Sequence, residues 1–391
     1  MLPRPGLSFT LPSIYDGTKL ECRVYHPQSC GVPWSGHAAV IAHPYAPLGG
    51  CFDDPIVDVA AGTILQLGFL AATFNFRGAG SSEGRTSWTS KPEQADYISV
   101  VGFLAYYVRH LECSPISGHA AQHHQNIMLL AGYSYGALIV TRLPPLDTIL
   151  EYFATPAAHT AEAEIRLRAQ YLAETQVSQA TLPPRPQDVS LGGIEDGSEK
   201  SQDGSNNPTS RLQREERIAS NVRKLLSCAK LEHRKSSHLS CQREDDNEMH
   251  HCLETYQGSV SFKAAYLAVS PPVGLVTRLA TLSFPSPLPS SWARRSTPTT
   301  QAAPVTDETP LASNPTLVIY GGRDGFISYG KMREWTRQLS GSRFRHVEVA
   351  EAGHFWTEND VVYRLRDAIG TFVNELTHLL APRAQMTQDV L

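Results

Sequence analysis

Gly132-Tyr133-Ser134-Tyr135-Gly136 joins two apolar runs of this 391-residue chain. Ile127 to Ala131 precedes the pentapeptide, and Ala137 to Val140 follows it. This order predicts a strand, a sharp turn and a helix, with Ser134 at the tip of the turn. The small residues on both sides let the turn close tightly enough to push the serine hydroxyl out of the fold. Three fixed positions are often matched by chance, so the weight of this pattern depends on what surrounds it.

Apolar runs of β-type composition recur in both halves of the chain, and each ends in polar, Gly or Pro residues. Near-continuous apolar strands with helical segments between them are typical of a parallel sheet covered on both faces. In such sheets, chemistry gathers at the carboxyl ends of the strands. The expected strands are Ala38–Ala42, Phe69–Phe76, Ile127–Ala131, Ala264–Val269, Thr316–Tyr320 and Arg345–Val349. The expected helices are Val57–Leu67, Gln94–Arg109, Lys331–Leu339 and Val361–Leu380.

The middle of the chain lacks this alternation of apolar strands and helical segments. We expect a core built from residues 8–147 and 260–380, interrupted by an insertion at 148–259 in the position of a lid. Within the insertion, Ala161–Thr175 and Leu212–Leu231 have helical spacing, so we expect lid helices that lie on the pocket. The polar segment between them, about 183–210, is predicted to be disordered. A second, Pro/Ser/Thr-rich excursion is expected at 283–310.

Composition limits the classes of partner. The formal net charge is −4, which gives no strong attraction to nucleic acid or to an acidic membrane surface. No apolar run is long enough to span a bilayer. The first residues lack the apolar region of a signal peptide, and the seven cysteines are scattered, so we expect reduced thiols and a cytoplasmic protein. The oligomeric state is left open.

Two further polar residues follow the serine turn, first an acid and then a histidine, each after a predicted strand. Asp324 comes after one predicted strand, in Gly321-Gly322-Arg323-Asp324, and His354 comes after the next, in Gly353-His354. Serine is a weak nucleophile at neutral pH and needs a base that is itself oriented by a carboxylate. The order Ser, acid, His is the one found on α/β-hydrolase sheets.

Two more segments carry a resemblance to a known family. His43-Pro44-Tyr45-Ala46-Pro47-Leu48-Gly49-Gly50 follows the first expected strand, and Asn75-Phe76-Arg77-Gly78-Ala79-Gly80-Ser81-Ser82-Glu83-Gly84 follows the second. With Ser270-Pro271-Pro272-Val273 and Ala352-Gly353-His354-Phe355, they make the chain resemble the α/β-hydrolase superfamily, in particular its small cytosolic group. The resemblance covers about residues 8–147 and 260–380 and implies a mostly parallel, doubly wound sheet. The low-complexity insertion resembles those of eukaryotic, among them fungal, proteins, and by analogy implies a role in specialised metabolism.

The resemblance also implies roles for individual residues. Ser134 would be the nucleophile, His354 the base and Asp324 the acid of a triad that forms an acyl-enzyme. The oxyanion hole would use the backbone N–H of Tyr135 and one from the loop after His43, either Tyr45 or Ala46. The implied substrate is a small-molecule ester or thioester, and neither a cofactor nor a metal is expected. Relatives often carry Phe beside the serine, and a tyrosine there could add a hydroxyl to the pocket.

Each of these residues also has a simpler interpretation. Ser134 could be an inert turn residue, His354 a loop histidine, and Asp324 the cap of a helix that starts near Ser328. If Asp324 pointed away from His354, Glu351 would be the nearest substitute. The alternative for the whole chain is a non-catalytic protein of the same fold that binds a partner through its insertion.

Several other polar groups are expected to be structural. We interpret His43 as support for its loop, and Arg77, Glu83 and Asp96 as a brace for the loop after the second strand. Two groups of metal-binding residue types match no ordinary zinc spacing, and we interpret them as solvated: His119, His123 and His124, and Cys241, His250, His251 and Cys252.

Overall fold

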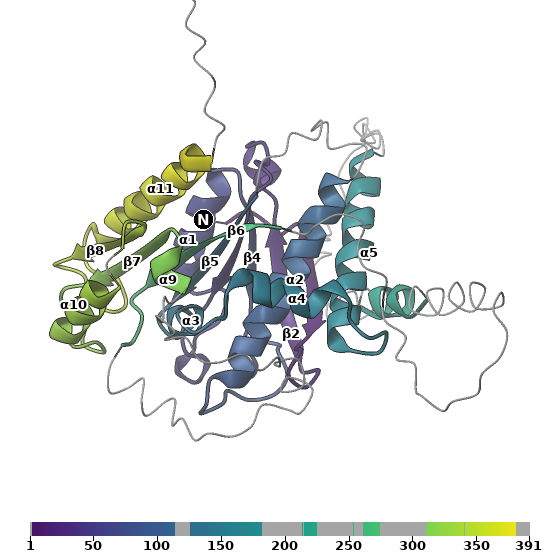
Figure 1. Ribbon diagram of the computed structural model, residues 1–391, viewed down its shortest axis with the longest axis horizontal. Helices are drawn as coiled ribbons and strands as arrows, with labels where there is room; N and C mark the ends of the chain where they lie inside the picture. Colours follow the sequence, from purple (N-terminus) through teal and green to yellow (C-terminus); the bar gives the residue numbers. More distant parts are fainter. Residues whose placement is uncertain are drawn as a thin grey trace, which may run out of the picture.

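The fold is built on one large β-sheet. The structure is a computed structural model that describes residues 2–113, 126–181, 213, 215–224, 253, 261–273, 310–339 and 341–380. Within these residues the sheet has eight strands in the order β1-β2-β4-β3-β5-β6-β7-β8 (Figure 1). The strands are β1 (Leu7–Pro12), β2 (Lys19–Tyr25), β3 (Ala38–Ala42), β4 (Leu70–Phe74), β5 (Ile127–Tyr133), β6 (Lys263–Val269), β7 (Thr316–Gly321) and β8 (Phe344–Val349).

Strand direction completes the topology. β2 runs antiparallel to both of its neighbours, β1 and β4. All pairs from β4 to β8 are parallel. This is the α/β-hydrolase fold, as predicted. The six expected strands are confirmed as β3 to β8, whereas β1 and β2 were not anticipated.

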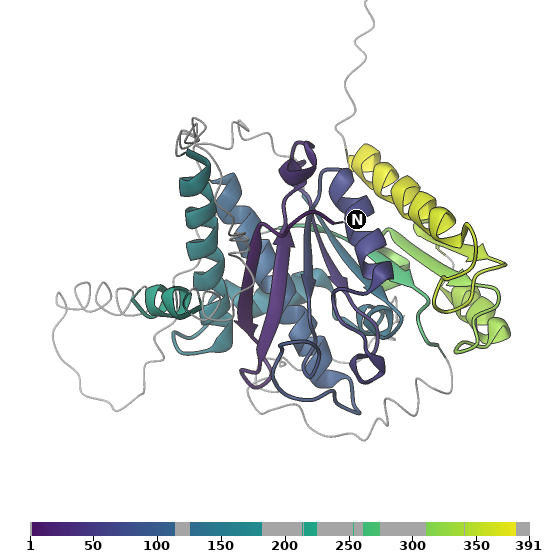
Figure 2. The same ribbon diagram turned by 180° about the vertical axis from the view of Figure 1, so that it is seen from behind.

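Helices cover both faces of the sheet. On one face, α1 (Pro55–Gln66) packs against α11 (Val361–Leu380), as Figure 2 shows from behind. The other face carries α2 (Lys91–Glu112) as its main helix. The remaining elements are η1 (Pro27–Cys30), η2 (Ala46–Leu48), α3 (Tyr135–Val140), α4 (Leu146–Ala154), α5 (Ala161–Thr181), α9 (Pro310–Ser313) and α10 (Tyr329–Gln338). The expected helices of the core are therefore confirmed as α1, α2, α10 and α11.

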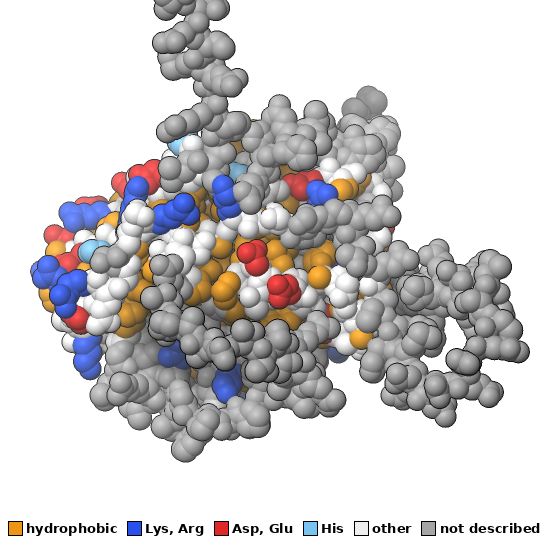
Figure 3. Space-filling view, viewed as in Figure 1, with side chains coloured by type: hydrophobic (Ala, Val, Ile, Leu, Met, Phe, Trp, Pro, Cys, Tyr) orange, Lys and Arg blue, Asp and Glu red, His pale blue; other side chains and the backbone are white. Residues whose placement is uncertain are grey.

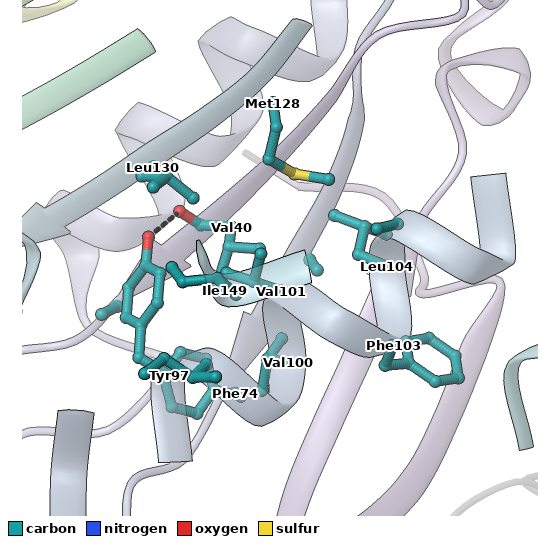
Figure 4. Packing of buried hydrophobic residues seen from close by; sticks show 14 of the residues in the cluster. Val40, Phe74, Tyr97, Val100, Val101, Phe103, Leu104, Met128, Leu130 and Ile149 are labelled. Atoms are coloured by element: carbon teal, nitrogen blue, oxygen red, sulfur yellow. Dashed lines mark hydrogen bonds between the residues drawn. The ribbon is translucent and has the colours of Figure 1, made fainter. Parts of the chain in front are cut away.

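The sheet separates two hydrophobic cores because successive side chains of a strand point to opposite faces. In β3, Val40 joins the core under α2, whereas Ile41 joins the core under α1 and α11. Figure 4 shows the first of these cores, in which Tyr97 of α2 donates a hydrogen bond to the Val40 carbonyl at 2.8 Å. The Tyr97 hydroxyl also lies 3.1 Å from the carbonyl of Ala131. One buried side chain thus fixes α2 to both β3 and β5, the strands that lead into the predicted site.

Charge is unevenly distributed over the face that carries α2 and α4. Figure 3 shows basic and acidic side chains mixed over the end of the molecule where α10, β8 and α11 lie. Hydrophobic side chains predominate toward the centre of the same face, with acidic side chains among them. Among the described residues, no helix combines the length and apolar content that a membrane crossing requires.

The described part of the insertion lies beside the sheet. α5 packs along α2 and also contacts α4 and β1, and Figures 1 and 2 agree on this position. A helix at 215–224 adds Ile218 and Val222 to the core under α2. The described residues of these helices pack their apolar faces against α2 and β1, and the expected position of the helices on the pocket stays a prediction. Residues 183–210 and 283–309 lie outside the described residues, so a lid and disorder there stay predictions.

Glu215 explains why the insertion attaches to β1. The Glu215 carboxylate accepts hydrogen bonds from the Thr10 backbone N–H at 2.7 Å and from the Thr10 hydroxyl at 2.9 Å. The Arg168 guanidinium donates to the Thr10 carbonyl at 2.9 Å and pairs with Glu215 at 3.3 Å. An edge strand exposes unpaired backbone groups that invite pairing with another chain. Here two charged side chains of the insertion satisfy the backbone N–H and carbonyl of Thr10.

Candidate active site

Ser134 occupies a strained turn between β5 and α3. Its backbone has φ 52° and ψ −115°, a conformation that residues other than glycine rarely adopt. The turn can close because Gly132 and Gly136, two positions before and after Ser134, lack side chains: a Cβ on Gly132 would lie 2.3 Å from the carbonyl carbon of Gly136. A hydrogen bond of 2.8 Å from the Ser134 N–H to the Val269 carbonyl ties the turn to β6. The predicted strand, turn and helix are all present.

The three residues of the predicted triad are brought into hydrogen-bonded contact. Ser134 Oγ lies 2.8 Å from His354 Nε2, and His354 Nδ1 lies 2.7 Å from Asp324 Oδ2. A carboxylate only accepts hydrogen bonds, so His354 Nδ1 is the donor to Asp324, and an imidazole with its one proton on Nδ1 offers Nε2 as the acceptor for the Ser134 hydroxyl. The side chains of His354 and Asp324 are only 7% and 2% exposed, so little water competes for these contacts.

Asp324 is held in place from its own loop. While Oδ2 faces His354, Oδ1 accepts the backbone N–H of Phe326 at 2.9 Å. Ser328 is the N-cap residue of α10 and has no side-chain cap, so Asp324 does not take the capping role. Glu351, the substitute considered from sequence, pairs with Arg364 at 2.9 Å and is half exposed. The geometry therefore favours Asp324 as the partner of His354.

Tyr133 supports His354, a contact that sequence reasoning missed. Its hydroxyl donates a hydrogen bond of 2.8 Å to the backbone carbonyl of His354. Burial, followed by the nearby charges of Asp54 and Asp324, raises the pKa of Tyr133, so the hydroxyl stays protonated and can donate. The suggestion that a tyrosine here adds a hydroxyl to the pocket is thus replaced by a positioning contact. The departure from Phe was the available signal.

A second contact missed from sequence lies just beyond His354. Trp356 is buried, has φ 55°, and donates its indole N–H to the Ser270 hydroxyl at 3.1 Å. Ser270 follows β6 and also has a positive φ, of 46°. The loop that carries His354 is therefore anchored to the end of β6 by one buried hydrogen bond. Nothing in the local sequence around either residue indicates this pairing.

The residues expected to form the oxyanion hole come from adjacent loops. Tyr135 is the first residue of α3, and Tyr45 precedes the short helix η2. Their rings meet edge to face with centroids 5.2 Å apart. The Tyr45 carbonyl accepts the N–H of Leu48 at 3.1 Å and of Gly50 at 3.2 Å, which gives the loop a compact turn. The roles of the Tyr135 and Tyr45 N–H groups, with Ala46 as the alternative, stay predictions.

The Tyr135 side chain is unusual in its surroundings. Within the described structure its buried hydroxyl has no hydrogen-bond partner. Burial raises the pKa of Tyr135, so the phenol is neutral. The ring packs against Tyr45 and, with centroids 6.0 Å apart, against Phe76. Tyr135 therefore acts as an aromatic spacer between the serine turn and the loops after β3 and β4.

His43 has a defined structural role. Its Nε2 accepts the backbone N–H of Phe76 at 2.9 Å, and its Nδ1 therefore donates to the Pro44 carbonyl at 2.6 Å. The ring is fully buried, and burial lowers the pKa of His43 to about 4. A neutral His43 thus links the loop after β3 to the loop after β4, in agreement with the structural interpretation made from sequence.

Buried histidines predict how stability depends on pH. Burial also lowers the pKa of His26 to about 4, while its Nε2 lies 2.9 Å from the Tyr107 hydroxyl. An unfolded histidine titrates near 6.5, so between pH 6.5 and 4 the unfolded chain binds protons that the folded chain excludes. The stability that these two neutral histidines contribute should therefore be fully present above pH 6.5 and should be lost as the pH falls toward 4.

The contribution of one histidine can be isolated with His26→Gln. Between pH 6 and 4.5 this variant should show a shallower loss of the free energy of unfolding, by about 1.4 kcal/mol per pH unit, because one proton no longer distinguishes the two states. Urea unfolding at a series of pH values measures this slope. Equal slopes in the variant and the wild type would show that His26 binds its proton equally in both states.

Arg77 and Asp96 brace the loop after β4, as the sequence interpretation expected. Arg77 Nη2 and Nε donate to the two oxygens of Asp96, at 2.7 and 3.0 Å, and both side chains are buried. The same guanidinium pairs with Asp16 at 2.9 Å, where the Asp16 side chain is 42% exposed. Glu83 contributes its backbone carbonyl, which accepts the N–H of Gly78 at 3.0 Å.

The two carboxylates on Arg77 form a matched pair for mutation. Asp96→Asn should lower the free energy of unfolding by about 3–5 kcal/mol, because it leaves a buried charge short of its partner. Asp16→Asn removes an exposed partner of the same guanidinium and should cost about 1 kcal/mol or less. Urea unfolding of both variants provides the comparison. Equal losses would show that Asp96 does not brace this loop.

Among the described residues, no group of three or more His, Cys, Asp or Glu side chains could hold a metal ion. His119, His123, His124, Cys241, His250, His251 and Cys252 lie outside the described residues. A cavity of about 690 Å³ lies at the amino ends of β5 to β8, where Leu146, Phe262 and Arg343 help to line it. Because Ser134 follows the carboxyl end of β5, this cavity is separate from the triad.

Comparisons with known proteins give likenesses of low identity. No family model matches the chain, and no curated protein matches its sequence. An alpha-beta serine hydrolase homologue from Coxiella burnetii is 14% identical, with a TM-score of 0.43, over 95% of this chain and 99% of that one. An a/b serine hydrolase without lid from Xanthomonas campestris is 16% identical, with a TM-score of 0.43, over 96% and 97%. Est1E from Butyrivibrio proteoclasticus is 10% identical, with a TM-score of 0.43, over 95% and 99%.

Proposed function

We propose that the protein is a serine hydrolase that cleaves an ester or thioester through an acyl-enzyme. The observation that carries this proposal is the hydrogen-bonded chain from Ser134 through His354 to Asp324, at 2.8 and 2.7 Å. A serine, a histidine and a buried carboxylate that are hydrogen-bonded in this order are what an activated serine nucleophile requires. A protein that only bound a partner would have no use for this arrangement.

Acylation begins when Ser134 Oγ attacks the substrate carbonyl carbon. His354 Nε2 takes the Oγ proton, and the imidazolium that results is stabilised by Asp324 at Nδ1. The carbonyl oxygen becomes an oxyanion, which the N–H groups of Tyr135 and Tyr45 would hold. When the tetrahedral intermediate collapses, the bond to the leaving group breaks, and Nε2 returns its proton to the departing oxygen or sulfur.

Deacylation repeats the same steps with water. Water gives a proton to His354 Nε2 as its oxygen attacks the acyl carbon, and the proton then passes to Ser134 Oγ as the bond to the acyl group breaks. The products are a carboxylic acid and the free enzyme. Every group that these steps use is a side chain or backbone N–H of the chain, so the proposed cycle needs no cofactor.

The same acyl-enzyme could serve specialised metabolism. If a hydroxyl of the acyl chain took the place of water, the product would be a cyclic ester, as in the release of a polyketide-type intermediate. We extend the proposal to this reaction class by analogy with the resemblance found in the sequence. Amides are poorer candidates, because an amine leaves only after more complete protonation than an alcohol or thiol requires.

Hydrolysis of simple acyl compounds tests the proposal. 4-Nitrophenyl butyrate and an N-acetylcysteamine thioester of the same acid should both be turned over, with stoichiometric release of 4-nitrophenolate and thiol. The rate of the His354→Gln variant gives the background, since glutamine keeps a side chain in place but removes the base. Release at the same rate by wild type and His354→Gln would contradict the proposed mechanism.

A further inference from the structure

Two exposed phenylalanines lie directly against His354. The ring of Phe326 is 4.7 Å from the imidazole, and the ring of Phe355 is 5.5 Å from it, measured between centroids. The two phenylalanines also meet each other edge to face at 5.6 Å. Phe326 comes from the loop after β7 and Phe355 from the loop after β8, so two separate segments bring one aromatic ring each to the same histidine.

Both phenylalanine rings are exposed to water, which is unfavourable in free energy for apolar surface. Phe326 is 48% exposed and Phe355 is 60% exposed, whereas Trp356, the next residue, is buried. Contiguous exposed apolar surface is a feature of contact sites for ligands or partners. Neither ring is needed to hold His354, because Asp324 and the Tyr133 hydroxyl already fix its side chain and its backbone.

The chemistry of the triad identifies the ligand that meets this pair. In the acylation step, His354 Nε2 must return its proton to the leaving oxygen or sulfur, so that atom must come within hydrogen-bond distance of the imidazole. The group attached to the leaving atom then extends past the edge of the His354 ring. Phe326 and Phe355 border that ring, whereas the acyl group stays bonded to Ser134 beside Tyr135 and Tyr45.

We propose that Phe326 and Phe355 form a leaving-group subsite that selects substrates with an aromatic or other apolar alcohol or thiol portion. The inference rests on the proposed hydrolase function and adds the specificity of its leaving-group side. Ring-to-ring contacts and burial of apolar surface would favour an aryl group over a polar group of similar reactivity. The exposed rings are then covered by substrate during each turnover.

A pair of esters isolates the subsite. Benzyl acetate and 2-methoxyethyl acetate share one acyl group and have leaving alcohols of similar acidity, but only the first is aromatic. The wild type should prefer the benzyl ester, and the double variant Phe326→Ala/Phe355→Ala should lower the ratio of the two kcat/KM values about tenfold. The conservative Phe326→Leu/Phe355→Leu should keep part of the preference. Tyr363→Ala removes a ring that is 65% exposed on α11 and should leave the ratio unchanged.

The rate of labelling by a small fluorophosphonate separates the subsite from the triad. Its leaving group is fluoride, which is too small to contact the aromatic pair, so labelling of the double variant should match the wild type within about twofold. An unchanged ester ratio with normal labelling would overturn the subsite while leaving the hydrolase intact. A parallel loss of labelling and of both esters would show that the rings only position His354 and would also overturn it. Wild-type protein that neither labels nor hydrolyses either ester would refute the hydrolase function itself.

Discussion

Ser134→Ala should lower the turnover of any cognate ester by about 10⁴–10⁶-fold, because it removes the atom that attacks the carbonyl carbon. Binding of the substrate should survive, since the loops that carry Tyr45 and Tyr135 are unaltered. The fold should survive as well. The Ser134 side chain makes its hydrogen bond with His354, and alanine occupies the same backbone position with the same positive φ. The free energy of unfolding should therefore change by about 1 kcal/mol or less.

Ser90→Ala is the matched control for this variant. Ser90 is also buried and has a positive φ, of 58°, but its hydroxyl accepts a hydrogen bond from Arg142 at 3.1 Å and makes none with the imidazole of His354. Steady-state kinetics and urea unfolding of both variants should show a loss of turnover only for Ser134→Ala. Turnover that persisted in Ser134→Ala, with release of product above the His354→Gln background, would remove Ser134 from the mechanism.

Asp324→Asn should lower kcat by about 10⁴-fold with little change in the fold. The amide keeps the size of the carboxylate but presents an N–H where Asp324 Oδ2 accepts the proton of His354 Nδ1 at 2.7 Å. The imidazole would then favour the tautomer with its proton on Nε2, which cannot accept the proton of Ser134. The imidazolium that forms in the transition state would also lose its neighbouring negative charge.

Glu351→Gln tests the alternative acid. Glu351 stands three residues before His354, and its ion pair with Arg364 keeps it on the surface. This variant should keep wild-type kcat, and measured values of kcat for the two amide variants decide between the two carboxylates. A larger loss for Glu351→Gln than for Asp324→Asn would assign the acid role to Glu351.

The centre of the sheet and the places of Ser134, Asp324 and His354 at strand ends could be predicted because local sequence determines them. β3, β5 and β7 are buried on both faces, so they appear in the sequence as unbroken apolar runs. Small or polar residues at their carboxyl ends then mark the turns where Ser134 and Asp324 lie. Because parallel strands bring their carboxyl ends to one edge of the sheet, residues that follow such strands could be expected to lie close together.

The edges of the structure were harder to predict. β1 alternates between buried and half-buried residues, and β2 carries Glu21 and Arg23, so neither forms an apolar run. Their partners are distant in sequence: Glu215 bonds to Thr10 across 205 residues. Tyr133 and His354 are 221 residues apart, so their contact depends on how β5 and the loop after β8 meet. Such pairings come from tertiary packing, which leaves no local periodicity in the sequence.

Mapping of a covalent adduct tests the central claim most directly. The folded wild type should react with a fluorophosphonate to give one adduct per chain, and peptide mass spectrometry should place that adduct on Ser134. Ser134→Ala should give no adduct, whereas Ser90→Ala should label like the wild type. The absence of an adduct on the folded wild-type protein, or its location on a residue other than Ser134, would contradict the assignment of Ser134 as an activated nucleophile.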